Sequence, residues 1–396
     1  MSRPRVFFYV QHLLGIGHLR RAAAIARGLE RHGLAVVFVS GGEPVSNLDL
    51  GDAERVQLPP ARAGDSGFGS IIDAAGRPID DAWRSRRRAA LLTAFDRYAP
   101  AAVMIELYPF GRRPFRFELK PLLEAAAARR PRPAVLCSVR DILVDKNDPR
   151  KTAETVDIIR HHFDLVLVHG DPQLIAFGAT FPAADRIADR LRYTGYVVGA
   201  APQVTAGPPE NAEILVSAGG GAVGGPLLRA ALGARPLTRV ARQPWRIVTG
   251  PNLPESEFRA IAAAAAESEM GETRVERFRA DFQDLLRNCR LSVSQAGYNT
   301  IMEVLAAGAR AVVVPFAEGG ETEQPVRARL LADRGLLTIA GPGELTPASL
   351  AAAIDAADRA PRPTASFDMS GADGTARAVI EVIDRLAANR SATVSP

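Results

Sequence analysis

The sequence predicts an α/β protein made of two domains, each a parallel β-sheet covered by helices on both faces. Apolar runs rich in β-branched residues alternate along the chain with amphipathic segments of helical period. Two of these runs, Val6–Val10 and Ile214–Ala218, lead into Gly-rich turns that lie about two hundred residues apart. A chain of 396 residues that is 47% hydrophobic can bury two substantial cores.

The first half has the pattern of repeated strand–helix–strand units. An amphipathic helix is expected after the first strand, from Leu19 to His32, and Gly33 ends it. The next strand spans Ala35–Ser40. The later strands of this half are almost continuously apolar, as parallel strands buried on both faces are. They are expected at Ala102–Leu107, Ala134–Val139 and Leu165–His169.

Polar side chains stand where these later strands end. Glu106 closes one strand, Arg140 and Asp141 follow the next, and His169 closes the third. In open α/β sheets, ligands bind beyond the carboxyl ends of the strands. We therefore expect these side chains and the first Gly-rich turn to converge on one crevice.

The second half repeats the alternation. Its strands are expected at Ile214–Ala218, Trp245–Thr249, Leu291–Ser294, Ala311–Pro315 and Leu336–Ala340. Amphipathic helices are expected at Thr346–Asp358 and at about Gly374–Ala388. The segment Ala200–Glu210, rich in Pro, Gly and small residues, is typical of a linker. These features place an N-terminal domain at residues 1–203 and a C-terminal domain at residues 210–372.

Composition narrows the class of partner and the compartment. The formal net charge is +5 and the pI is near 9.5, and the basic residues are scattered arginines rather than a Lys/Arg block. This favours anionic small molecules or an anionic membrane surface, and no nucleic acid. Cys137 and Cys289 are too few and too far apart for a zinc site or a disulfide framework, which favours the reducing cytoplasm. Val6–Val10 is too short for a signal or spanning segment.

A strand, a turn and a helix are expected in succession at residues 291–308. The strand that ends at Ser294 delivers Gln295–Gly297 as a turn. Asn299 or Thr300 is expected to cap the next helix, whose first amides are then free to bind a diphosphate. Glu303, in the first turns of that helix, can accept hydrogen bonds from two vicinal hydroxyls.

This motif, with the strand Ala311–Phe316 and the pair Glu323-Gln324, resembles the nucleotide-sugar-binding signature of GT-B glycosyltransferases. It is most similar to the family that contains the N-acetylglucosaminyltransferase of peptidoglycan lipid intermediates, and to related bacterial glycosyltransferases. The resemblance is strongest over Ala212–Ala340 and Arg5–Gly33. It implies an α/β, GT-B fold of two Rossmann-like domains whose parallel sheets face each other across a cleft. It also implies that a C-terminal helix, residues 373–390, packs back on the N-terminal domain.

The resemblance further implies an enzyme. The expected reaction is inverting, metal-independent transfer of a sugar from a nucleoside diphosphate sugar, such as a UDP-sugar, to a hydroxyl acceptor. The matching Glu of the family binds the nucleotide ribose, which assigns that role to Glu303. Glu323 and Gln324 match the position that contacts the donor sugar, although the loop before them is more acidic and about one residue longer than is usual. No Asp-x-Asp motif or metal-ligand cluster occurs, so neither a metal nor a cofactor is expected.

The candidate donor site gathers the second Gly-rich turn, the turn and helix just described, and the acidic loop. Its residues are Gly219, Gly220, Gly221, Gln295, Ala296, Gly297, Asn299, Thr300, Glu303, Glu323 and Gln324. The candidate acceptor side, which is also suited to a phosphate, comprises Gly15, Gly17, Glu106 and Arg140. The alternative interpretation is that the glycines only allow tight packing of helix on sheet.

His18 and Asp141 are the candidate catalytic residues. His18 follows the first Gly-rich turn at a helix N-terminus, where the helix dipole disfavours the imidazolium and keeps a basic imidazole near pH 7. The resembled family has a His at the corresponding turn near the acceptor, which favours His18 as the general base. Asp141 is the rival base or the group that orients a His, and its alternative is a salt bridge to Arg140 or Arg20.

The segment Glu106–Phe117 interleaves aromatic residues with arginines. Such a run suits an anionic membrane or a polyprenyl phosphate acceptor. It equally suits a surface loop whose Phe side chains are core and whose Arg side chains are solvated. The expected location is the cytoplasm, with peripheral contact at the inner face of the membrane if the acceptor is lipid-linked.

Two other functions remain open from the sequence. A non-hydrolysing nucleotide-sugar 2-epimerase shares the two-domain architecture and needs several acidic groups at the sugar, which the segment Glu318–Glu323 supplies. A non-catalytic nucleotide-sugar-binding protein would bind the donor without transfer or hydrolysis.

Overall fold

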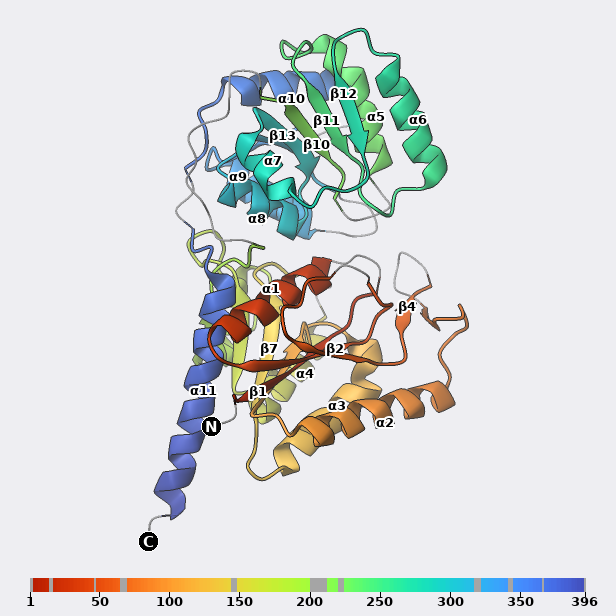
Figure 1. Cartoon of the computed structure of the whole chain (residues 1–396). Coiled ribbons are helices and arrows are strands. Elements are labelled where there is room, and N and C mark those ends of the chain that lie inside the picture. Colours follow the sequence, from red (N-terminus) through yellow and green to blue (C-terminus); the bar gives the residue numbers. More distant parts are fainter. Residues whose placement is uncertain are drawn as a thin grey trace. The chain divides into compact units, whose positions relative to one another are not determined.

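The computed structural model describes residues 3–13, 17–45, 48–64, 70–143, 148–199, 212–219, 224–316, 322–340, 345–364 and 367–394. The chain divides into two compact units (Figure 1). The first unit comprises Met1–Gly199 and Ser370–Pro396, and the second comprises Ala200–Met369. The expected linker, residues 200–210, lies outside the described residues.

The first unit is built on a seven-stranded parallel sheet with the order β3-β2-β1-β6-β7-β8-β9. Its strands are β1 Arg5–Val10, β2 Ala35–Ser40, β3 Glu54–Gln57, β6 Ala102–Glu106, β7 Ala134–Arg140, β8 Leu165–His169 and β9 Leu191–Tyr193. A small antiparallel pair joins β4 Ala61–Ala63 to β5 Ile71–Asp73. The helices are α1 Gly17–Arg31, α2 Asp81–Tyr98, α3 Arg116–Ala128, α4 Pro149–His162 and α11 Gly371–Val394.

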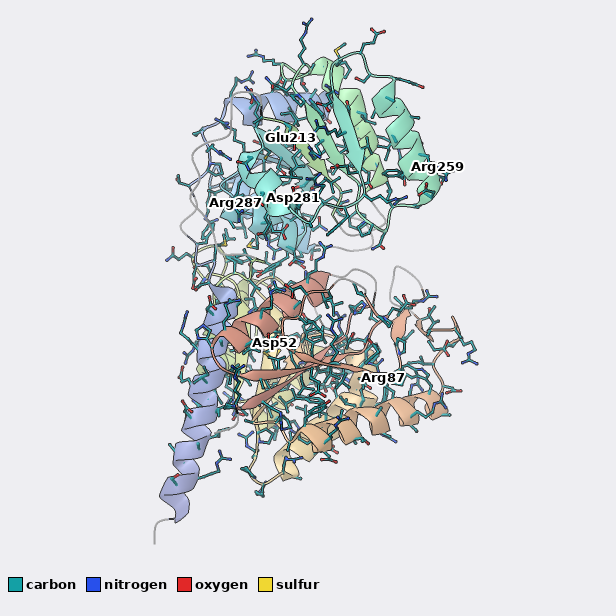
Figure 2. The ribbon with its side chains drawn as sticks, in the orientation of Figure 1. Asp52, Arg87, Glu213, Arg259, Asp281 and Arg287 are labelled. Carbon is teal, nitrogen blue, oxygen red and sulfur yellow. The ribbon has the colours of Figure 1, made fainter. Side chains whose placement is uncertain are left out.

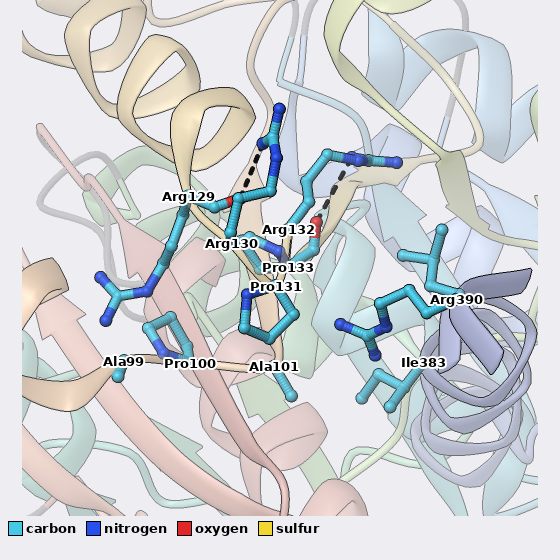
Figure 3. A pocket seen from close by; sticks show the side chains of 11 residues that line it. Ala99, Pro100, Ala101, Arg129, Arg130, Pro131, Arg132, Pro133, Ile383 and Arg390 are labelled. Carbon is cyan, nitrogen blue, oxygen red and sulfur yellow. Dashed lines mark hydrogen bonds between the residues drawn. The ribbon is translucent and has the colours of Figure 1, made fainter. Parts of the chain in front are cut away.

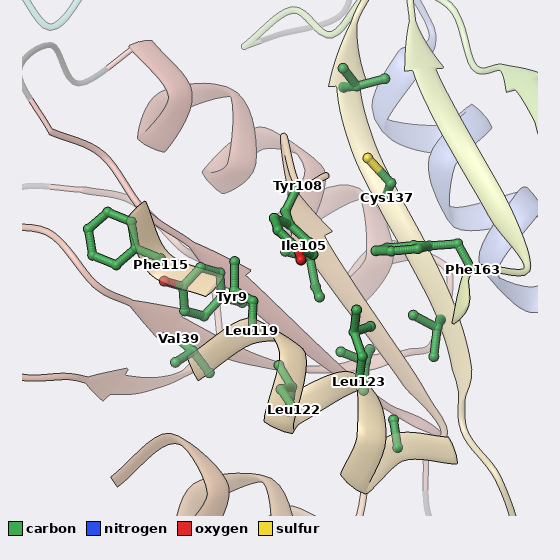
Figure 4. Close-up of a cluster of buried hydrophobic side chains, with 14 of the residues drawn as sticks. Tyr9, Val39, Ile105, Tyr108, Phe115, Leu119, Leu122, Leu123, Cys137 and Phe163 are labelled. Carbon is green, nitrogen blue, oxygen red and sulfur yellow. The ribbon is translucent and has the colours of Figure 1, made fainter. Parts of the chain in front are cut away.

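Strand β1 shows why this sheet is buried on both faces. Its side chains alternate, so that Phe7 and Tyr9 lie in one hydrophobic cluster and Phe8 and Val10 lie in the other. The first cluster packs the sheet against α2, α3 and α4 (Figure 4). The second packs it against α1 and α11. A strand buried on both sides must be apolar at every position, which is the pattern of Val6–Val10.

A buried ion pair lies within the first cluster. The guanidinium of Arg87 on α2, labelled in Figure 2, contacts the carboxylate of Glu118 on α3 at 2.8 Å, and both side chains are fully buried. The hydroxyl of Tyr9 on β1 donates to the same carboxylate at 2.5 Å. Removing one partner of such a pair typically costs about 3–5 kcal/mol of stability. The pair therefore fixes α2 and α3 against the strand that leads to His18.

Helix α11 returns the chain to the first unit. Ala378, Val379 and Val382 belong to the cluster that also contains the buried side chains of α1. The two helices approach closely at Gly28, where an added Cβ would lie 2.8 Å from the carbonyl oxygen of Ala372. Beside them, Val197 and Ser370 form an antiparallel bridge, and the amide of Gly371 donates to the carbonyl of Tyr196 at 3.0 Å.

The second unit is built on a six-stranded parallel sheet with the order β12-β11-β10-β13-β14-β15. Its strands are β10 Ile214–Ser217, β11 Trp245–Val248, β12 Thr273–Glu276, β13 Leu291–Gln295, β14 Ala311–Val314 and β15 Thr338–Ile339. Its helices are α5 Gly225–Ala234, α6 Glu255–Ala266, α7 Phe282–Asn288, α8 Tyr298–Ala306, α9 Glu323–Ala332 and α10 Pro347–Arg359.

Each sheet reverses its order at one point. In the first unit the chain proceeds outward from β1 through β2 and β3, then crosses to β6 on the other side of β1. In the second unit it proceeds from β10 through β11 and β12, then crosses to β13. The helices that follow two such neighbouring strands pack on opposite faces, which leaves a crevice beyond the strand ends. The β1/β6 and β10/β13 junctions are therefore the expected ligand sites.

Candidate active site

The β1/β6 junction of the first unit holds a histidine and a glutamate in contact. Nδ1 of His18, the second residue of α1, lies 2.7 Å from Oε1 of Glu106, the last residue of β6. Glu106 is 1% exposed, whereas His18 retains 20% exposure. The carboxylate of Glu106 is thus buried, whereas the imidazole of His18 is accessible to a ligand.

Three arginines surround this pair. Arg21 donates to Oε1 of Glu106 at 2.5 Å, and Nη2 of Arg112 lies 3.9 Å from Oε2 of Glu106. Nη2 of Arg140 lies 3.4 Å from Nε2 of His18. Glu106 and Arg140 thus lie beside His18 at the start of α1. Gly17 is the first residue of α1, and Gly15 lies outside the described residues.

The surroundings fix the protonation of both partners. Burial, reinforced by the charges of Arg140 and Arg112 and opposed by Glu106, lowers the pKa of His18 to about 4. Burial alone would raise the pKa of Glu106, but His18, Arg21 and Arg112 outweigh it and hold this pKa well below its usual range. At neutral pH the carboxylate can only accept, so Nδ1 of His18 carries the proton. Nε2 then carries the lone pair, with Nη2 of Arg140 at 3.4 Å, and can take up a proton as a general base does.

Asp141 occupies a different position. It is fully buried, Oδ2 accepts a hydrogen bond from the Tyr196 hydroxyl at 2.9 Å, and Oδ1 accepts from the amide of Ile142 at 2.9 Å. The carboxylate in contact with His18 is therefore that of Glu106. His169 is also fully buried, with its ring nitrogens 2.8 Å from Ser138 Oγ and 2.9 Å from Thr194 Oγ1.

The aromatic residues of Glu106–Phe117 belong to the core. Tyr108 and Phe115 are fully buried, and Phe110 makes an edge contact with Phe177. Arg113 and Arg116 both pair with Glu154. The aromatic side chains of this run thus pack in the core, as the surface-loop alternative expected, and two of its arginines pair with Glu154. Among the described residues, no helix is long and apolar enough to cross a membrane.

The β10/β13 junction of the second unit is lined by glycine and the start of a helix. Gly219 follows β10 in the left-handed region, with φ of +71°, where a side chain would strain the backbone. An added Cβ there would lie 4.0 Å from Oγ1 of Thr300 on α8. The two turns predicted at the donor thus lie next to each other. Gly220 and Gly221 fall outside the described residues.

Helix α8 starts two or three residues earlier than a cap at Asn299 or Thr300 would require. Its N-cap is Gly297, whose φ of −63° and ψ of 146° are extended, and no side chain caps it. Asn299 and Thr300 lie inside the first turn, so the expected cap was wrong. An added Cβ at Gly297 would meet nothing within 4 Å, so the space beside the first amides is open. Glu303 follows on the same helix and is half-buried.

Gln295, Ala296 and the α9 residues complete the predicted donor set. Gln295 ends β13 and is half-buried, whereas Ala296 is fully buried. Glu323 is 2% exposed and accepts a hydrogen bond from Arg327 at 2.7 Å. Oε1 of Gln324 accepts from the amide of Phe316 at 3.1 Å. The acidic residues of 317–321 lie outside the described part of the chain.

Known proteins resemble this chain in sequence and in fold. Residues 216–381 match the glycosyltransferase family 28 C-terminal domain. A segment of 135 residues is 25% identical to the UDP-N-acetylglucosamine–N-acetylmuramyl-(pentapeptide) pyrophosphoryl-undecaprenol N-acetylglucosamine transferase of Rhizobium leguminosarum bv. trifolii, covering 33% of this chain and 36% of that enzyme. The chain resembles the MurG family of GT-B glycosyltransferases. It spans about a third of the length of this curated relative.

Solved GT-B structures match nearly the whole chain. The MurG structure from Acinetobacter baumannii matches with a TM-score of 0.57 and 18% identity, over 97% of this chain and 99% of that one. The calicheamicin glycosyltransferase CalG4 matches with a TM-score of 0.61 and 17% identity, over the full length of both chains. The predicted two-domain, Rossmann-like GT-B fold is therefore confirmed, and residues 216–381 carry the C-terminal domain of a glycosyltransferase.

One residue of the GT-B donor half was missed in the sequence. Phe278 stands two residues beyond the carboxyl end of β12 and is 60% exposed. Its neighbours are held in place, since Arg277 stacks on the ring of Phe258 and Arg279 pairs with Asp281. An exposed aromatic ring at the ligand-binding edge of a GT-B domain is a candidate for stacking on a base. The sequence did not point to Phe278 because β12 is an edge strand without the apolar run that marks a central strand.

No group of three or more His, Cys, Asp or Glu side chains suited to a metal occurs among the residues that the structure describes.

Proposed function

We propose that this chain transfers a sugar from a nucleoside diphosphate sugar to a hydroxyl acceptor, with inversion and without a metal ion. The observation that carries the proposal is the His18–Glu106 pair at the β1/β6 junction, because one imidazole nitrogen of this pair is unprotonated at neutral pH. The glycosyltransferase family 28 match over residues 216–381 supports a nucleotide-sugar donor in the second unit.

His18 is the proposed general base. As the acceptor hydroxyl attacks the anomeric carbon, Nε2 takes its proton, and the bond to the diphosphate oxygen breaks. The imidazolium that forms is stabilised by the ionised Glu106 at 2.7 Å from Nδ1. Direct displacement by the acceptor on the face opposite the leaving group inverts the anomeric carbon.

The donor is assigned to the β10/β13 junction. The N-terminus of helix α8 and the backbone at Gly219 suit the diphosphate. Glu303 is the proposed partner of the ribose hydroxyls, and Phe278 is the proposed contact of the nucleobase. In this arrangement the helix N-terminus stabilises the leaving diphosphate, the role that a metal ion has in other transferases.

The acceptor is proposed to carry a phosphate. Arg21, Arg112 and Arg140 surround one carboxylate, so the site keeps a positive excess. Nε of Arg112, which is buried, has no hydrogen-bond partner among the described residues. A phosphate oxygen would satisfy such a donor. The relative named above acts on a pyrophosphoryl-undecaprenol, and a lipid-linked acceptor would hold this enzyme at the inner face of the membrane.

The test is incubation of the purified protein with a panel of nucleotide sugars, with and without phosphorylated acceptors. Released nucleoside diphosphate together with a new glycoside supports transfer. A product epimerised at C2 without any acceptor would favour the 2-epimerase, and binding without either product would favour a non-catalytic protein. Excess EDTA is expected to leave the transfer rate unchanged.

A further inference from the structure

A second basic site lies at the opposite edge of the first sheet. A pocket of about 240 Å³ opens beside the amino ends of β6 and β7 (Figure 3). Four arginines line it, and Ile383 and Leu386 of α11 add an apolar wall. The lining arginines are Arg129, Arg130, Arg132 and Arg390. His18 lies beyond the carboxyl ends of these parallel strands, so this pocket is separate from the proposed active site.

The positive charge of the pocket is only partly neutralised. Arg132 makes two contacts with Asp164, at 2.6 and 3.1 Å, and Arg129 contacts the exposed Asp96 at 3.3 Å. These two carboxylates balance two of the four guanidiniums.

The other two guanidiniums have no carboxylate partner within the described residues. Arg130 donates to the carbonyls of Ala127 and Arg129 at the end of α3, at 2.8 and 2.9 Å. Arg390 is exposed on α11 and makes no hydrogen bond or ion pair with the described part of the chain. In Figure 3 its guanidinium extends from α11 past Ile383 toward Pro131. The pocket therefore has a net positive charge and one guanidinium free to bind.

The positive surface continues into a neighbouring pocket of about 280 Å³. The two pockets share Arg132, and the second is also lined by Arg160, His161 and Arg190. Arginine forks bind phosphate oxygens in pairs, and an adjoining apolar wall suits the organic part of a phosphate ester.

We propose that the pocket between α3, the start of β7 and α11 binds a phosphate ester, whose charged group contacts Arg390 and Arg129 and whose apolar part lies on Ile383 and Leu386. A ligand held in this way would link α11 to the loop that precedes β7. The proposal is independent of the transfer reaction, because none of the residues assigned to donor or acceptor lines this pocket.

Phenyl phosphate is the probe, and hydrogen–deuterium exchange of the full chain is the readout. Phenyl phosphate is expected to slow amide exchange in the peptides that contain residues 99–102, 129–134 and 383–390. Arg390→Glu should weaken the apparent affinity of that protection about tenfold or more, because it replaces a charge-assisted contact by a repulsive one. Arg385→Glu is the matched control, since Arg385 is exposed on the same helix and does not line the pocket.

Equal protection in Arg390→Glu and Arg385→Glu, or no protection of these three segments, would overturn the proposal. Arg390→Gln, which removes the charge without reversing it, covers the case in which the Glu variant misfolds. Inorganic phosphate should protect the same segments more weakly than phenyl phosphate, since it lacks the apolar part.

The source of the phosphate is decided by sedimentation with vesicles. Phosphatidylcholine vesicles that contain phosphatidic acid should pull down the wild type more than Arg390→Glu if the ligand is a lipid headgroup, and pure phosphatidylcholine should not. Protection by phenyl phosphate without such sedimentation assigns the site to a soluble phosphate ester. Absence of both effects would refute the site altogether.

Discussion

The imidazole of His18 and the carboxylate of Glu106 are joined at 2.7 Å across 88 residues of sequence. They meet because β1 and β6 are neighbours in the sheet, and each residue stands at or just beyond a carboxyl end. At neutral pH the carboxylate of Glu106 is ionised, while the imidazole of His18 is neutral. The pair therefore combines a neutral base with a fixed anion, and its parts can be tested separately.

Replacement of His18 tests the base. His18→Ala is expected to leave the dissociation constant of the donor nearly unchanged and to lower turnover by about 10²–10⁴-fold, the usual contribution of a positioned base. Steady-state kinetics with donor binding by calorimetry checks both. His161→Ala, at an exposed histidine at the end of α4, is the matched control. Near-normal turnover of His18→Ala would show that His18 is not the base.

Replacement of Glu106 tests the orienting group. Glu106→Gln keeps the shape but removes the charge that stabilises the imidazolium, so turnover should fall by about 10²-fold or more. The buried Arg21 also loses its ionic partner, so thermal unfolding of the variant must be measured alongside. A larger loss of turnover in an equally folded Asp141→Asn would assign the orientation of the base to Asp141 instead.

Replacement of Glu303 tests the ribose contact. Glu303→Ala should weaken binding of the nucleoside diphosphate by about 1–3 kcal/mol, the scale of hydrogen bonds to a charged group. Calorimetric titration measures this, and Glu269→Ala serves as the control at an exposed glutamate of the same unit. Unchanged affinity in a folded Glu303→Ala would remove this residue from the donor site.

Replacement of Phe278 tests the nucleobase contact. Phe278→Ala should raise the KM for the donor with little change in kcat, because stacking on a base contributes about 1–3 kcal/mol to binding. Phe278→Tyr should restore the affinity. Leu237→Ala removes an equally exposed apolar side chain elsewhere in the unit and should have no effect. Loss of kcat at constant KM would contradict a binding role.

The stability of the first unit should depend on pH through its buried histidines. Burial lowers the pKa of His169 to about 3 and that of His18 to about 4, whereas both approach about 6.5 on unfolding. The unfolded chain therefore binds more protons in this window, and stability falls as the pH drops from about 6.5 toward 4. The slope approaches about 1.4 kcal/mol per pH unit for each histidine.

The two tryptophans make this measurement selective. Trp83 lies in the first unit and Trp245 in the second, so Trp245→Phe leaves a fluorescent reporter of the first unit alone. Urea unfolding at pH 7, 5.5 and 4.5 should show the fall in stability, and His169→Asn should make it shallower. An identical pH slope in His169→Asn would show that this histidine is not the source.

The central strands could be predicted because a strand that is buried on both faces carries apolar side chains along almost its whole length. Strands β2 and β8 have the predicted bounds, Ala35–Ser40 and Leu165–His169. The edge strands β3 and β12 were not predicted. Glu54–Gln57 and Thr273–Glu276 pair on one side only and carry exposed or half-buried polar residues, so no apolar run marks them.

The sequence identified His18 and Glu106 as candidate site residues, but it did not predict that they contact each other. His18 and Glu106 each follow a strand, which marked them as ligand-side residues. Their contact depends on β6 crossing to the far side of β1, and strand order is not encoded in local periodicity. Asp141, which also follows a strand, could therefore compete with Glu106 as partner of the histidine. Gly297 was missed as the α8 cap because its role comes from backbone conformation rather than from a side-chain acceptor.

The bridge between Val197 and Ser370 places the departure of the chain from the first unit beside its return. The second unit is thus an insertion in the sequence of the first, between residues 199 and 370. If residues 200–369 were replaced by the equivalent part of a relative, all strands of the first sheet and helix α11 would keep their own sequence. Under the proposed function, such a graft changes the sugar nucleotide while the acceptor site is inherited unchanged, so the two specificities can evolve independently.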